Sequence, residues 1–121
     1  MDKRILIIDD DRQMLSSLEM LFLAEAYQVK SIDTAGLIKG ALESFKPTII
    51  LMDIRLDGAD GRLFCDEIKQ DLTTKHIPVI LITALSFQEI SEMDCLADAI
   101  IGKPATIERL LQITEQLLKV K

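Results

Sequence analysis

Five short strand-like runs recur along this chain, and a longer segment of helical periodicity separates most of them from the next. The runs are Ile5–Ile8, Val29–Ile32, Ile49–Met52, Val79–Ile82 and Ala99–Ile101. The first, third and fourth are continuously apolar, which is typical of strands that are covered on both faces. The pattern therefore predicts five β-strands, with three of them buried on both sides.

Between these runs, apolar residues recur at intervals of three and four, the spacing of one face of a helix. The helix after Asp60-Gly61 is the third, and Thr106 is the predicted N-cap of the last. Between Leu85 and Asp98 the apolar anchors are few, which predicts a fourth helix that is short or mobile. The other four predicted faces comprise Met14, Leu15, Leu18, Leu21 and Phe22; Leu37, Ile38, Ala41, Leu42 and Phe45; Leu63, Phe64, Ile68 and Leu72; and Ile107, Leu110, Leu111, Thr114, Leu117 and Leu118.

Strands that alternate with helices through short connections predict an α/β fold. Such a chain forms a parallel sheet with right-handed crossovers and with helices on both faces. No linker or repeat interrupts the pattern, and 121 residues suffice for one core but not for two. Hydrophobic residues make up 49% and charged residues 28%, as in globular proteins. We therefore expect one domain that covers residues 1–121.

Charge and hydropathy exclude several classes of function. The formal net charge is −6, whereas a nucleic-acid surface needs clustered Lys and Arg, so we expect no direct contact with nucleic acid. No apolar run approaches the ~20 residues that span a bilayer, and the N-terminal residues do not resemble a signal peptide. We expect a cytoplasmic protein with no membrane contact. Cys65 and Cys95 are then predicted to be reduced apolar side chains rather than a disulfide or a redox pair.

Chemically active side chains follow four of the predicted strands. Asp9 and Asp10 come directly after the first, Asp53 ends the third, Thr83 follows the fourth and Lys103 follows the fifth closely. In an open parallel sheet, ligands bind in the crevice beyond the carboxyl ends of the strands. Acids at such ends suggest a cation and the lysine suggests an anion. We therefore predict a site for Mg²⁺ together with a phosphoryl group.

The three carboxylates indicate the chemistry of this site. Like charges ~4 Å apart repel by about 4 kcal/mol at an effective dielectric constant near 20, so a cation is needed to offset them. Mg²⁺ suits one or two carboxylates, waters and a phosphate. A carboxylate beside the metal can attack phosphorus and form an acyl phosphate, with Lys103 and Thr83 holding the phosphoryl oxygens.

Purely structural interpretations of these residues stay open at this point. Asp11 is better explained as the cap of the first helix than as a ligand. Lys103 is alternatively an ordinary surface lysine, and Thr83 alternatively caps the local backbone. His76, the only histidine, is better explained as a solvated loop residue than as a phospho-accepting one.

An ordered set of motifs resembles a known family. Asp9-Asp10, Leu51-Met52-Asp53, Asp60-Gly61, Ile82-Thr83-Ala84 and Lys103-Pro104 occur in the order found in the receiver (CheY-like) domain of two-component response regulators. The resemblance covers essentially the whole chain. It implies a doubly wound, flavodoxin-like fold with five parallel strands in the order 2-1-3-4-5.

The resemblance also implies a phospho-accepting switch in a phosphorelay rather than an enzyme. Asp53 would take a phosphoryl group from the phosphohistidine of a sensor histidine kinase or a histidine phosphotransfer protein. Asp10, Asp53 and the backbone carbonyl of Arg55 would bind Mg²⁺, and Asp9 would act through a metal-bound water. Thr83 and Lys103 would hold the phosphoryl oxygens. An attached domain or a partner, which the sequence does not identify, would respond to the phosphorylated state.

Two other functions are weighed against this one. A degenerate receiver that acts only as a binding module is favoured by Ile100 and Ala105, which stand where family members usually carry aromatic residues. The complete acceptor, metal and lysine set argues against it. A phosphatase with an aspartate nucleophile needs a second acid two residues after that nucleophile, where this chain has Arg55. We therefore expect a phosphorylated signalling domain.

Overall fold

A computed structural model of the chain describes residues 2–84, 88–89 and 95–119, and its centre is a five-stranded sheet. The strands follow the order β2-β1-β3-β6-β7, and each neighbouring pair is parallel. With the five sheet strands counted in chain order, this is the predicted order 2-1-3-4-5, and each strand is one residue longer at one end than predicted. The bounds are Arg4–Ile8 (β1), Gln28–Ile32 (β2), Ile49–Asp53 (β3), Val79–Thr83 (β6) and Ala99–Gly102 (β7).

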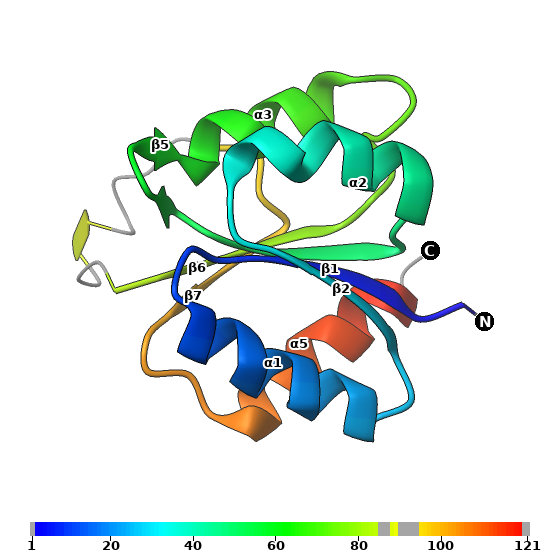
Figure 1. The fold of residues 1–121 in the computed structure, drawn as a ribbon, viewed down its shortest axis with the longest axis vertical. Helices are drawn as coiled ribbons and strands as arrows, with labels where there is room; N and C mark the ends of the chain where they lie inside the picture. Colours follow the sequence, from blue (N-terminus) through cyan, green and yellow to red (C-terminus); the bar gives the residue numbers. More distant parts are fainter. Residues whose placement is uncertain (1, 85–87, 90–94, 120–121) are drawn as a thin grey trace.

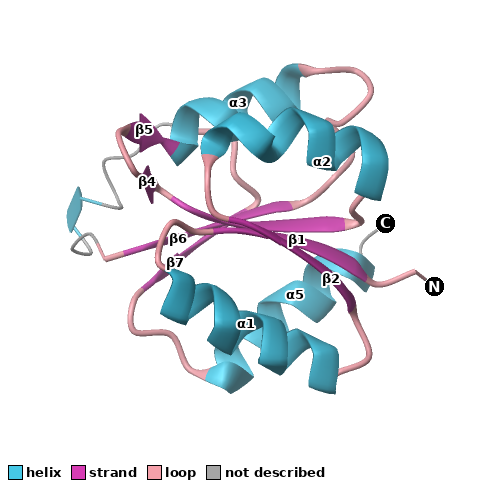
Figure 2. Ribbon diagram, viewed as in Figure 1, coloured by secondary structure: helices cyan, strands magenta, loops and turns pink. Residues whose placement is uncertain are grey.

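Helices cover both faces of the sheet, as the doubly wound prediction requires (Figures 1 and 2). One face carries α1 (Arg12–Ala24) and α5 (Ile107–Lys119). The opposite face carries α2 (Ile38–Phe45), which follows the 3-10 turn η1 (Ala35–Leu37), and α3 (Gly61–Gln70). Among the described residues, no helix is both long and apolar enough to cross a membrane.

The central strands are apolar throughout because each divides its side chains between two cores. In β1, Ile5 and Ile7 pack with α1 and α5, whereas Leu6 and Ile8 pack with α2 and α3. All four of these side chains are fully buried. Successive residues of a strand point to opposite faces, so a strand covered on both sides must be apolar at every position.

The described helices lie where the sequence predicts them, but some residues of the predicted buried faces are exposed. Leu72 was placed on the buried face of the third helix, but it lies beyond the end of α3 and is 80% exposed. Ile107 is 57% exposed in the first turn of α5, and Leu37 and Leu63 are also exposed. These residues sit at helix ends or at the margin of the apolar arc, where a helix surface turns away from the sheet. The predicted cap is confirmed, since the Oγ1 of Thr106 accepts the amide of the third following residue at 3.1 Å.

A small hairpin that the sequence pattern does not predict connects β3 to α3. Its strands, β4 (Arg55–Leu56) and β5 (Ala59–Asp60), are too short for a periodic signal. They turn at Asp57 and Gly58, whose φ angles are 23° and 82°. Glycine adopts a positive φ without steric cost, which favours it at this turn. The expected fourth helix between residues 85 and 98 lies largely outside the described residues. Within this range, the described residues 88 and 89 are helical.

Candidate functional site

The carboxyl ends of the strands bring the predicted site residues to one edge of the sheet. Parallel pairing aligns Ile8 with Met52, Asp53 with Ile82, and Thr83 with Gly102. Each site residue lies at one of these strand ends or within two positions of it. Residues far apart in the sequence therefore meet because four parallel strands end at the same level.

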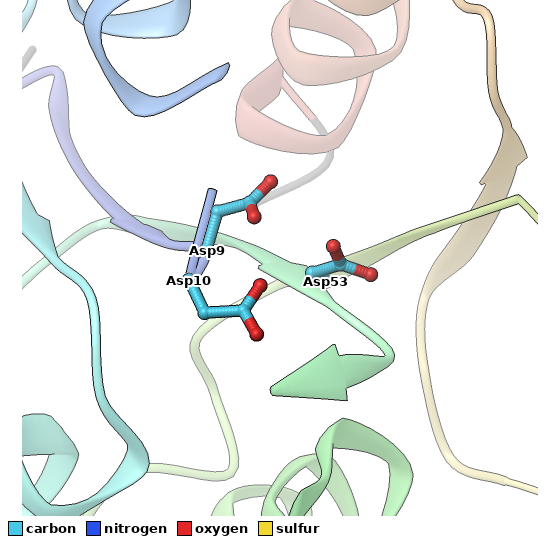
Figure 3. A group of neighbouring side chains, drawn as sticks. All are labelled: Asp9, Asp10 and Asp53. Atoms are coloured by element: carbon cyan, nitrogen blue, oxygen red, sulfur yellow. The ribbon is translucent and has the colours of Figure 1, made fainter. Parts of the chain in front are cut away.

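Three of these residues form an acidic cluster. One carboxylate oxygen from each of Asp9, Asp10 and Asp53 lies within 4.8 Å of the others. Figure 3 shows the three side chains gathered at the ends of β1 and β3. Asp9 and Asp53 are buried, with exposed fractions of 1% and 8%, and Asp10 faces solvent. The predicted convergence of the three acids is confirmed.

Backbone amides hold each carboxylate in place. Asp9 Oδ1 accepts the amide of Asp11 at 2.9 Å, and Asp53 Oδ1 accepts the amide of Arg55 at 3.1 Å. Asp10 Oδ2 accepts the amide of Asp57 in the hairpin turn at 2.8 Å. The unpredicted hairpin therefore has a role in the site, because its turn anchors an acid from another strand.

The structural interpretation of Asp11 is correct. It is the N-cap of α1, and its carboxylate accepts the amides of Gln13 at 3.0 Å and Met14 at 3.3 Å. Both bonds satisfy amides of the first helical turn. Asp11 is thus committed to the helix, and the acids available for a ligand are its two predecessors and Asp53.

Lys103 provides the positive charge of the site. Its Nζ lies 2.9 Å from Asp53 Oδ2 and 3.7 Å from Asp9 Oδ2, so the prediction that it faces the acids is confirmed. Its backbone amide donates to the Thr83 carbonyl at 2.6 Å, and the peptide bond to Pro104 is cis. Burial alone would lower the pKa of Lys103, but the hydrogen bond and charge of Asp53, with the charge of Asp9, raise it. The lysine therefore stays charged.

Asp9 has one buried carboxylate oxygen that no hydrogen bond from a described residue satisfies. Its Oδ2 is buried and has no hydrogen-bond partner in the described part of the chain, because Lys103 at 3.7 Å is beyond hydrogen-bond distance. Burial is the largest cause that raises the pKa of Asp9 above 3.8, and the Asp53 and Asp10 charges add to it. The Asp11 amide and Lys103 oppose the rise without cancelling it.

These features fit a divalent cation. The cluster offers three oxygen donors and only one neutralising lysine, and an orphaned buried oxygen lies within it. Hard, oxygen-rich donor sets of this kind suit Mg²⁺. The amide of Arg55 is fixed by Asp53, whereas the ligand role of its carbonyl stays a prediction.

Replacing Asp9 with asparagine should stabilise the metal-free protein at neutral pH. A buried acid with a raised pKa holds its proton more tightly in the folded state, so its contribution to stability falls as the pH rises above 3.8 through the raised pKa. Asn cannot ionise, so the variant does not lose this stability. We expect its Tm at pH 7 to be higher by roughly 4 °C, which corresponds to about 1 kcal/mol in the free energy of unfolding. The gain should vanish at acid pH.

Thermal unfolding with EDTA across this pH range would measure the effect, with the exposed acid Glu43→Gln on α2 as a matched control. An Asp9→Asn gain that is the same at every pH would show that it does not come from the buried charge.

A cavity of about 230 Å³ opens beside Asp53. Asp53, Thr83 and Lys103 lie around this one space, as predicted. The Arg55 side chain, two residues after Asp53, also lines this cavity. Sequence reasoning did not find Glu89 there, because Glu89 does not stand at the end of a main strand. The lining is completed by Ala84.

A larger hollow lies elsewhere in the structure. It measures about 860 Å³ and is lined by Arg4 and Thr48 near the amino ends of the strands, and by His76. It contains none of the predicted site residues. His76 is exposed there, in agreement with its interpretation as a solvated loop residue. The size of a hollow therefore does not locate the chemistry of this fold.

Comparisons of sequence and of structure with known proteins agree on one family. The family described as "Response regulator receiver domain" matches residues 5–115. The response regulator PleD of Caulobacter vibrioides is 40% identical over 85 residues, 70% of this chain and 19% of PleD. A CheY-like receiver domain from Methanospirillum hungatei JF-1 has a TM-score of 0.88 at 29% identity, covering 99% of this chain and 96% of that one.

A third similarity concerns the fold alone. The receiver domain of the sensor histidine kinase PA1611 from Pseudomonas aeruginosa PAO1, solved with a magnesium ion in its active site cleft, has a TM-score of 0.87 at 22% identity. The match covers 98% of this chain and 99% of that one. The curated relatives are longer than this chain, which spans 19% of PleD and 49% to 52% of several transcriptional regulators that it also matches.

Proposed function

Because this chain belongs to the family of response regulator receiver domains, we propose that it accepts a phosphoryl group on Asp53. The observation that carries the proposal is the arrangement around that carboxylate. Lys103 Nζ lies 2.9 Å from one oxygen, two further acids have an oxygen within 4.8 Å, and an open cavity adjoins it. A nucleophile, a cationic group and space for a phosphoryl group therefore occur together.

The transfer follows from these positions. An oxygen of Asp53 attacks the phosphorus of a phosphohistidine, an O–P bond forms as the N–P bond breaks, and the imidazole leaves. Lys103, which pairs with Asp53 before the reaction, lies close enough to hold a phosphoryl oxygen afterwards. Thr83 lines the same cavity, where its hydroxyl would donate to another oxygen. Neither residue has to travel far.

Mg²⁺ is the cofactor that we propose for this site. Asp10, Asp53 and the Arg55 carbonyl would hold it, and Asp9 would contact it through water. When bound, it supplies positive charge that neutralises the phosphoryl oxygens. The orphaned oxygen of Asp9 and the magnesium ion in the PA1611 receiver support this assignment.

The partners that we propose follow from the family. The phosphoryl donor is a sensor histidine kinase or a histidine phosphotransfer protein in the cytoplasm, and an attached domain or partner reads the phosphorylated state. The domain is then a signalling switch rather than an enzyme. Two features argue against a phosphatase: the residue two positions after Asp53 is Arg55, and it lines the acceptor cavity as a cation.

The test is incubation with acetyl phosphate in the presence of Mg²⁺ or EDTA, followed by intact-mass measurement. A receiver gives a protein that gains one phosphoryl group only with Mg²⁺. A phosphatase hydrolyses the donor without accumulating the adduct, and a degenerate binding module does neither. Either of the last two results would overturn the proposal.

Asp10→Asn should weaken Mg²⁺ binding at least about tenfold, because one of the carboxylate donors becomes neutral. Its amide oxygen can still accept the Asp57 amide, so the loop should keep its shape. Binding to the folded state raises Tm by mass action, and the Mg²⁺ dependence of Tm measures the affinity. Asp57→Asn is the matched control, since it removes an equal charge from a residue outside the cluster. Equal Mg²⁺ affinity in both variants would refute the ligand role of Asp10.

A further inference from the structure

Two cysteines from distant parts of the sequence pack against the same core. Cys65 lies in α3 and is fully buried among the residues between the sheet and α2 and α3. Cys95 is half-buried just before β7 and packs against that cluster. Both are free thiols, in agreement with the sequence-based prediction. That both pack in one cluster is the feature that the prediction did not include.

Two polar contacts hold α3 beside the segment that leads into β7. Asp66 Oδ1 accepts the amide of Leu96 at 2.9 Å. Lys69 Nζ, on a side chain only 14% exposed, lies 2.9 Å from Asp98 Oδ2. The segment 95–98 therefore runs along α3, and Asp66 and Leu96 are its first pair of contacts.

Each cysteine immediately precedes one residue of the Asp66–Leu96 hydrogen bond. Cys65 precedes Asp66, and Cys95 precedes Leu96. The electrostatics agree with this placement: burial is the largest cause that raises the pKa of Cys65 to about 12, and the charge of Cys95 is the next. Cys65 and Cys95 therefore lie on adjoining segments and belong to the same packed region.

We propose that Cys65 and Cys95 form an intramolecular disulfide when the protein meets hydrogen peroxide. In the first step peroxide transfers an oxygen to the Cys95 sulfur, giving a sulfenic acid and one water. In the second step the Cys65 sulfur attacks the Cys95 sulfur, the S–O bond breaks, and the hydroxyl leaves with the Cys65 proton as a second water. Two thiols lose two electrons in total, and peroxide gains them.

The environments of the two thiols set this order. Cys95 is partly exposed and can meet a dissolved oxidant, whereas Cys65 has no exposed surface. The raised pKa of Cys65 keeps its thiol protonated, and a thiolate is the reactive form. Cys95 is therefore oxidised first, and the slower attack by Cys65 leaves time to trap the sulfenic acid.

The disulfide would connect α3 covalently to the approach to β7. The Asp66 and Lys69 contacts already hold these segments together, so the covalent bond would make an existing contact permanent. Since β7 ends next to Lys103, the redox state of the cysteines would affect the strand that positions the lysine of the site. This inference does not depend on phosphorylation, and its test uses no phosphoryl donor.

The experiment treats the folded, full-length chain with a slight excess of hydrogen peroxide and then digests it without reductant. We expect the thiol count to fall from two to zero, with a peptide pair joined through Cys65 and Cys95 and lighter by two hydrogen atoms. In Cys65→Ala, dimedone should label Cys95, whereas in Cys95→Ala the Cys65 thiol should survive the same treatment.

Asp66→Ala tests whether the fold directs the reaction. This variant loses the bond to Leu96, so disulfide formation should slow several-fold. Glu67→Ala, which removes the exposed acid next along α3, should react like the wild type. The proposal is overturned by intermolecular dimers or sulfinic acids without the joined peptide, or by equal rates in the two variants.

Discussion

Asp53→Asn should reduce acetyl-phosphate labelling to background while the protein stays folded. The substitution replaces a nucleophilic carboxylate oxygen with an amide nitrogen that cannot form the acyl phosphate. The amide oxygen can still accept the Arg55 amide, which holds this side chain at 3.1 Å, so the strand end should keep its shape. Intact-mass measurement with Mg²⁺ gives the adduct, and circular dichroism gives the fold.

Asp11→Asn is the matched control for this result. It neutralises an acid two residues after Asp9, but Asn caps a helix about as well as Asp does, so α1 should be unaffected. We expect this variant to be labelled like the wild type. Labelling of Asp53→Asn, with the phosphoryl group mapped to another residue in the wild type as well, would contradict the acceptor assignment.

The fold was predictable because the strands are buried on two faces. A run such as Ile5–Ile8 is short, continuously apolar and rich in β-branched isoleucine, which favours a central strand over a buried helix. Alternation with helices then implies a parallel sheet. The edge positions Leu72 and Ile107 were wrong because periodicity identifies the direction of an apolar face but not where the neighbouring surface ends.

The site was predictable to the same degree and for a related reason. The residues after parallel strands must meet at one edge, so Asp9, Asp53 and Lys103 had to converge once the strands were identified. The sequence could not show that Asp10 is anchored by the hairpin turn, or that Cys95 packs against the cluster that contains Cys65. Such contacts depend on how loops cross the ends of the sheet, and no periodic signal encodes them.

Gly61→Ala should be the most destabilising single substitution near the site. A Cβ at this position would collide with the Asp53 carbonyl oxygen and lie 3.1 Å from the Ile54 Cα. All the nearest atoms belong to the backbone, so no side-chain rotation can relieve the collision. Overpacking of this kind costs roughly 1–3 kcal/mol. The collision also falls on Asp53, the proposed acceptor, so we expect slower phosphorylation as well as a lower Tm.

Gly40→Ala is the matched control, and it should raise the free energy of unfolding where Gly61→Ala lowers it. Gly40 lies inside α2, and a Cβ there would meet no atom within 4 Å. Ala favours the helix, because glycine loses more backbone entropy on folding, and the gain is roughly 0.5–1 kcal/mol. Urea denaturation of both variants gives the two free energies, and acetyl-phosphate labelling gives the two rates. If Gly61→Ala proved as stable and as reactive as Gly40→Ala, the first turn of α3 would not be in close contact with the end of β3 at Asp53. The tight connection from β3 through the hairpin to α3 would then no longer explain how Asp53 is positioned.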